Sequence, residues 1–217
     1  MMKRNRETCI VVDLDGTLID FEKIDKKIIQ SIYGENRGVK WIDKVLWKIN
    51  SYDIITNNIF IFTMRILLYS ILSFSNPVKA FVLYGIKYRE NVLEQIDDTL
   101  LQNLDFLKTL ADKMYIATND IFVHAIYKDL PVKNIVVGKK KKFISSLYRH
   151  FEVKYVIGNN YMDDILSCKK LNQNYKKHDM KTRATMVYVG KSVLIWKMSS
   201  LLRFEKIDDF IRYVKEK

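Results

Sequence analysis

Residues 8–18 read TCIVVDLDGTL, and this stretch decides the fold. Its first part is a short apolar run rich in β-branched residues, which is typical of a strand buried on both faces of a sheet. The run ends at Asp15-Gly16, a pair that favours a turn. The sequence therefore predicts a buried strand that delivers two aspartates, Asp13 and Asp15, to the end of a sheet.

Strands and helices are predicted to alternate from about residue 90 to the end of the chain. Short apolar runs predict strands over residues 113–117, 134–137, 154–157 and 186–189. Apolar residues at helical spacing predict helices over residues 92–107, 120–129, 139–151 and 207–214. This alternation indicates an α/β fold, a Rossmann-like parallel sheet with helices on both faces.

Polar side chains follow three of these predicted strands. They are Asp13 and Asp15, then Thr118 and Asn119, then residues 159–164. Ligand sites in parallel sheets lie beyond the carboxyl ends of the strands, so we expect these side chains to share one rim. A carboxylate there could accept a phosphoryl group as an acyl phosphate, and a second could transfer protons. The charge of such a site favours Mg²⁺, which prefers oxygen ligands.

The segment Asp13-Leu14-Asp15-Gly16-Thr17 resembles the first motif of the haloacid dehalogenase-like phosphatases. The resemblance implies that Asp13 is the nucleophile and a metal ligand. It also implies that Asp15 is the general acid and base and binds the metal through its backbone carbonyl. The presence of Asp15 favours phosphate chemistry, because the dehalogenases of this superfamily lack an aspartate there. The alternative is a simple turn in which Asp15-Gly16 caps the strand.

The second and third motifs of the family have counterparts in the same order. Residues 115–119 resemble the second motif, which implies that Thr118 and the Asn119 backbone N–H bind the phosphoryl oxygens. The third motif is a lysine that begins a helix. The candidates for it are Lys139, Lys140, Lys141 and Lys142. We choose Lys140, because apolar residues follow it at the family's spacing of three, four and seven positions.

The fourth motif is usually Gly-Asp followed by a second Asp. Here Gly158 precedes Asn159, and Asp163 follows with Asp164 as the adjacent alternative. The implied metal ligands are Asp13, Asp15, Asn159 and Asp163. An amide oxygen can bind a hard cation, but Asn159 removes one negative charge, which predicts weaker metal affinity.

Residues 21–89 are predicted to form a helical cap inserted into a core of residues 1–20 and 90–217. Residues 59–74 are apolar almost all round but contain Arg65, and they are fewer than the ~20 needed to span a bilayer. We expect a buried cap helix, with an interfacial helix as the alternative. Three roles stay open for the apolar side chains: cap core, a pocket for a lipid-linked phosphate, or a membrane-facing surface. These side chains are Phe60, Phe62, Leu67, Leu68 and Tyr69.

The formal net charge of +12 favours anionic partners, such as phosphorylated metabolites or anionic lipid surfaces. The aromatic residues form no RNA-binding pattern, which disfavours nucleic acid as a partner. Cys9 and Cys168 show neither a disulfide framework nor a metal pattern, as expected of a reduced cytoplasmic protein. The N-terminal apolar run is too short for a signal peptide.

The sequence thus predicts a magnesium-dependent phosphohydrolase that forms an aspartyl-phosphate. Its expected substrate is a small or lipid-linked phosphorylated molecule, in the cytoplasm or at the inner face of the membrane. The alternative is a non-catalytic binding or regulatory protein that keeps the phosphatase fold.

Overall fold

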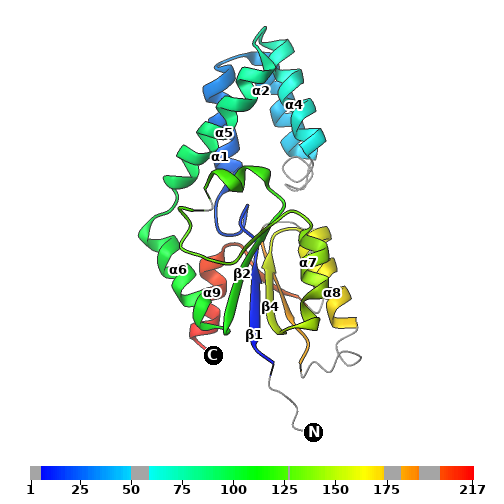
Figure 1. The fold of residues 1–217 in the computed structure, drawn as a ribbon. Coiled ribbons are helices and arrows are strands. Elements are labelled where there is room, and N and C mark those ends of the chain that lie inside the picture. Colours follow the sequence, from blue (N-terminus) through cyan, green and yellow to red (C-terminus); the bar gives the residue numbers. More distant parts are fainter. Residues whose placement is uncertain (1–5, 50–58, 127, 174–181, 191–200) are drawn as a thin grey trace.

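The computed structural model describes residues 6–49, 59–126, 128–173, 182–190 and 201–217. Its centre is a parallel sheet of six strands in the order β3-β2-β1-β4-β5-β6 (Figure 1). The strands are β1 (Thr8–Val12), β2 (Lys113–Thr118), β3 (Ile135–Val137), β4 (Glu152–Gly158), β5 (Thr185–Val189) and β6 (Leu202–Phe204). The predicted parallel, Rossmann-like sheet is therefore confirmed. The sequence analysis missed β6, since a three-residue strand with a central Arg203 leaves no apolar run.

Helices cover both faces of this sheet. One face carries α6 (Asp98–Thr109) and α9 (Ile207–Lys215), and the other carries α7 (Lys140–Ser146) and α8 (Leu166–Gln173) (Figure 1). The side chains of β1 alternate between two apolar clusters, with Ile10 and Val12 in one and Cys9 and Val11 in the other. These four side chains are buried, which explains why β1 is a continuous apolar run.

Three predicted helices differ from those observed. The helix expected over residues 92–107 is interrupted, because α5 (Pro77–Leu93) ends and the Asp97 side chain caps the start of α6. The helix expected over residues 120–129 is a short 3₁₀ helix, η1 (Ile121–Ala125), capped by Asp120. The helix expected over residues 139–151 divides into α7 and the 3₁₀ turn η2 (Leu147–Arg149). In the first two, an aspartate that accepts backbone hydrogen bonds sets where the helix begins.

Within the described residues, four helices form a separate region at the carboxyl end of β1, which we call the cap. They are α1 (Phe21–Tyr33), α2 (Arg37–Ile49), α4 (Ile59–Leu72) and α5 (Figure 1). The boundary predicted at residue 89 falls inside α5. Among the described helices, none is by itself long and apolar enough to cross a membrane. Residues 60–72 and α5 reach the required length and apolar content only when taken together, and the two helices meet at a bend of 119°.

Arg65, the charge in the apolar segment, is buried inside the cap. Its guanidinium lies 2.6 Å from Asp25 Oδ2 and 2.7 Å from Asp43 Oδ1. Tyr84 donates a hydrogen bond to Asp25, and Tyr69 donates one to Asp43. We call Arg65, Asp25 and Asp43 the cap ion cluster. Two of the apolar side chains whose role was left open, Phe62 and Tyr69, are cap core, whereas Phe60, Leu67 and Leu68 are exposed.

Candidate active site

The carboxyl end of β1 brings Asp13 to the centre of the sheet rim. The Asp13 backbone N–H continues the strand ladder by donating to the Ile157 carbonyl of β4 at 2.9 Å. The Asp13 side chain is buried, and its Oδ1 accepts from the Leu14 N–H at 2.9 Å. Burial raises the pKa of Asp13, and the adjacent Lys140 opposes that rise. Sheet pairing therefore fixes this carboxylate before any ligand arrives.

The Asp15 carboxyl bridges the core and the cap. Its Oδ2 accepts a hydrogen bond from the Thr118 hydroxyl at 3.0 Å, and its Oδ1 accepts one from the Tyr88 hydroxyl of α5 at 3.2 Å. Burial raises the pKa of Asp15 well above its usual value, and the charges of Asp120 and Asp13 raise it further. A raised pKa makes a carboxyl group better suited to donate a proton to a leaving group.

Gly16 makes the turn after Asp15 possible. Its φ of 73° lies in the left-handed region that glycine adopts without strain. A Cβ at this position would also lie 2.0 Å from Asn159 Nδ2, so any other residue would displace Asn159 from the rim. The simple-turn alternative explains the conformation of Gly16 but not this approach of Asn159.

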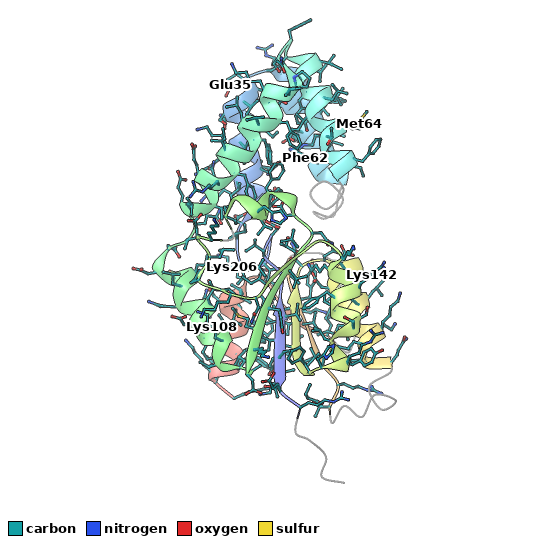
Figure 2. All side chains as sticks on the ribbon, viewed as in Figure 1. Glu35, Phe62, Met64, Lys108, Lys142 and Lys206 are labelled. Atoms are coloured by element: carbon teal, nitrogen blue, oxygen red, sulfur yellow. The ribbon has the colours of Figure 1, made fainter. Side chains whose placement is uncertain are left out.

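The buried lysine of the site is Lys140, at the first turn of α7. Its Nζ lies 2.7 Å from Asp13 Oδ1 and 2.8 Å from Asp164 Oδ1. Burial opposes its charge, but the carboxylates of Asp13 and Asp164 raise the pKa of Lys140 above its usual value. Lys142, which competed for this role in the sequence, points away from the sheet on the outer face of α7 (Figure 2).

The fourth motif places its two acids differently. Asp164 is fully buried, pairs with Lys140, and accepts from the Asn160 N–H at 3.1 Å. Gly158 leaves room for this carboxylate, since a Cβ there would lie 2.1 Å from Asp164 Oδ2. Asp163 Oδ2 instead accepts from the amides of Asn119 and Asn160, at 3.0 and 3.3 Å. Asp164 is thus the partner of the lysine, whereas Asp163 holds the neighbouring loops together.

Asn159 offers a test of whether the rim fits a cation. Its side-chain Oδ1 is buried and accepts no hydrogen bond from any described residue. A buried amide oxygen without a donor is stabilised by a cation, and Mg²⁺ binds such oxygens. Within the described residues, no three or more Asp, Glu, His or Cys side chains are grouped as a metal site. The predicted set is compatible with this, because it relies on an amide and a backbone carbonyl beside two carboxylates.

Asp120 is an acid of the site that the sequence analysis did not single out. It is buried two residues after Thr118, and its N–H donates to the Thr118 hydroxyl at 2.9 Å. Burial raises the pKa of Asp120 to about 6, while a hydrogen bond from Tyr88 opposes the rise. The sequence places this acid directly after Thr118-Asn119, which could have identified it as a site residue. Its proximity to Asp15, however, depends on the fold.

Aromatic side chains join the cap to this rim. Phe122 of η1 packs against Phe62, Tyr84 and Tyr88, with ring centroids 5.2, 5.0 and 5.7 Å apart. Among the described residues, aromatic rings thus line the cap side of the site, and the Tyr88 hydroxyl reaches Asp15. Such a wall limits the access of water to the Asp15 carboxyl.

No protein-family model and no curated protein matches the chain. Several solved structures match it over nearly its full length. YfnB of Bacillus subtilis, named a HAD-hydrolase bound to magnesium, has a TM-score of 0.58 at 16% identity, covering 98% of this chain and all of that one. A protein of Thermotoga maritima named as a β-phosphoglucomutase has a TM-score of 0.58 at 12% identity, and the match covers 97% of this chain and 99% of that one. A haloacid dehalogenase-like family hydrolase of Xanthomonas campestris has a TM-score of 0.50 at 12% identity, and the match covers 100% of this chain and 94% of that one.

Proposed function

We propose that this chain, which has the fold of the haloacid dehalogenase-like hydrolases, is a magnesium-dependent phosphohydrolase acting through an aspartyl-phosphate. The observation that carries the proposal is the bridge from Lys140 Nζ to Asp13 and Asp164, beside an Asp15 carboxyl held by Thr118. This arrangement supplies a nucleophile, a cation to offset phosphoryl charge, and a proton donor on one rim.

In the proposed reaction, Asp13 attacks the phosphorus atom of a phosphate monoester. The bond from phosphorus to the leaving oxygen breaks, and Asp15 gives its proton to that oxygen. Asp15 then takes a proton from water, which attacks phosphorus and releases inorganic phosphate and free Asp13. Lys140 and the Thr118 hydroxyl stabilise the charge on the phosphoryl oxygens, and the Asn119 N–H is a further candidate donor.

The residues proposed to hold Mg²⁺ are the Asp13 carboxylate, the Asp15 backbone carbonyl and the Asn159 amide oxygen. The buried Asn159 Oδ1 without a hydrogen-bond donor supports this assignment. Asp163 remains a proposed ligand, although its Oδ2 is engaged by two amides. When bound, the cation would neutralise the charge between the nucleophile and the phosphate and orient the two.

The direct test is release of phosphate from p-nitrophenyl phosphate over a magnesium titration. Wild type should be active and lose activity with a chelator. Asp13→Asn should be inactive at every magnesium concentration. Asp105→Asn is the matched control, because Asp105 is an exposed acid on α6 paired with Lys108, and it should retain wild-type activity. An inactive wild type would favour a binding protein with this fold, whereas an active Asp13→Asn would show that Asp13 is not the nucleophile.

A further inference from the structure

The outer surface of the cap carries two rows of exposed apolar side chains. On α4 the row is Met64, Leu67, Leu68 and Ile71, and on α5 it is Val78, Val82 and Ile86. Figure 2 shows Met64 pointing away from the cap, whereas Phe62 on the same helix points toward α5. Both rows run to the turn between α4 and α5, at the end of the cap farthest from the sheet (Figure 1). Exposed apolar surface of this extent usually marks an interaction site.

Phe74 in that turn is unfavourable for the isolated protein in two ways. Its φ is 53°, at the position after a helix where glycine is the usual residue. Two hydrogen bonds close the turn. The Phe74 N–H donates to the Ile71 carbonyl at 3.2 Å, and the Ser75 N–H donates to the Ser70 carbonyl at 2.8 Å. The Phe74 side chain is 99% exposed, so packing within the chain does not account for an aromatic residue here.

Basic residues flank this apolar turn. Asn36 donates to the Leu72 carbonyl at 3.2 Å, which brings the exposed Arg37 of α2 beside the end of α4. Lys79 is exposed in the first turn of α5. No Asp or Glu occurs between Asp53 and Glu90, so neither α4 nor the first turns of α5 carry an acid. The combination of apolar side chains with cations at their edge is typical of surfaces that insert into anionic membranes.

We propose that the cap tip, formed by Ile71, Phe74, Val78, Arg37 and Lys79, docks on the surface of an anionic lipid bilayer. The first three side chains, which are 62%, 99% and 72% exposed, enter the acyl boundary. The two cations contact lipid phosphates. This inference is independent of the proposed function, because none of these residues belongs to the candidate active site.

A second copy of the chain is a poorer occupant of the same surface. Two such tips would bring Arg37 and Lys79 toward their own counterparts, in a protein of net charge +12. The exposed acid nearest to Arg37 in the sequence, Glu35, already pairs with Lys40. An anionic bilayer neutralises these charges, whereas a symmetric dimer would bring them closer together.

Co-sedimentation of the full chain with lipid vesicles tests the proposal. Wild type should bind phosphatidylcholine vesicles that contain phosphatidylglycerol, and bind vesicles of phosphatidylcholine alone much more weakly. Phe74→Gly should lower the partition into anionic vesicles about tenfold. The same variant should be at least as thermally stable as wild type, because glycine relieves the positive φ. Loss of binding would then not be a result of unfolding.

Two further variants separate the contributions. Lys79→Gln should weaken binding to anionic vesicles about fivefold without changing binding to neutral ones. Leu93→Ser removes an exposed apolar side chain at the opposite end of α5 and should leave binding unchanged. Three results would overturn the proposal: no vesicle binding by wild type, full binding by Phe74→Gly, or sedimentation as a dimer that Phe74→Gly dissociates.

Discussion

The core and the cap each bury a cation between two carboxylates, and the comparison of the two clusters separates a structural ion pair from a candidate site. In the core, Lys140 lies between Asp13 and Asp164. In the cap, Arg65 lies between Asp25 and Asp43. All of these side chains are buried, so burial and ion pairing alone do not identify an active site.

The two clusters differ in how completely their polar atoms are used. In the cap, Asp25 accepts two hydrogen bonds from Arg65 and one from Tyr84. In the core, the buried Oδ1 of Asn159 accepts no hydrogen bond from any described residue. The cap ion cluster is therefore internally satisfied, which suits a structural role. The rim around Lys140 leaves an acceptor for a cation, which suits chemistry.

The largest expected effect on stability comes from breaking the cap ion cluster. Arg65→Ala leaves two buried carboxylates without their cation and should lower the free energy of unfolding by about 3–5 kcal/mol. Denaturant unfolding followed by circular dichroism measures this. Arg89→Ala is the matched control, because its pair with Asp129 is exposed, and it should cost less than about 1 kcal/mol. Equal losses in the two variants would show that the cap ion cluster is not structural.

Lys140→Met is the corresponding change in the core. It should lower the rate of phosphate release by about 100- to 1,000-fold, because the phosphoryl charge loses its cation. Lys142→Met removes an exposed lysine from the same helix and should retain activity. Steady-state kinetics at saturating magnesium compare the variants. A Lys140→Met enzyme with wild-type turnover would mean that Lys140 is as structural as Arg65.

Asp120→Asn tests how a buried acid of the core changes the folding stability with pH. The pKa of Asp120 is raised by burial to about 6 in the folded state, so its neutral form favours folding and its ionisation opposes it. The stability linked to this group is present below pH 4 and is lost as the pH rises through about 6. Asp120→Asn should therefore be more stable than wild type at pH 7.5, by on the order of 2 kcal/mol. Near pH 4 the two should be equal, and thermal melts without metal would show whether the difference depends on pH.

The smallest effect is expected from Asn159→Asp, which adds a charge to the proposed metal site. It should tighten magnesium binding about tenfold, or ~1.4 kcal/mol. The midpoint of the magnesium-induced rise in melting temperature reports this without relying on activity. Asn172→Asp, in α8 away from the rim, should leave that midpoint unchanged. An unchanged midpoint in Asn159→Asp would remove Asn159 from the proposed ligands.

The sequence predicted the parts of the site that depend on local order along the chain. Asp13 and Asp15 end a strand whose composition identifies it, and the spacing of apolar residues selected Lys140, which the structure buries beside Asp13. The choice between Asp163 and Asp164 could not be made in the same way. The π-helical turn η3 (Tyr161–Ile165) is wider than an α-helical turn, and within it Asp164 is the acid that pairs with Lys140.

The cap was less predictable, because its stability depends on contacts between distant residues. The partners of Arg65 lie 22 and 40 positions away, so the sequence showed a charge in an apolar helix without showing its compensation. The same limit applies to Trp41. Helical spacing puts Trp41 on the same helix face as Ile42 and Val45, but α2 leaves Trp41 68% exposed. Local periodicity identified the helices, but it did not determine which helix faces the packing would cover.

The most direct test of the central claim is to detect the phosphoryl group on Asp13. Wild type mixed with substrate and magnesium is quenched in acid, digested, and its peptides are analysed by mass spectrometry. The account predicts a phosphorylated peptide that contains Asp13, present only with magnesium and absent in Asp13→Asn. Phosphate release by wild type without any phosphorylation of Asp13, or phosphorylation of another residue, would contradict the proposed mechanism.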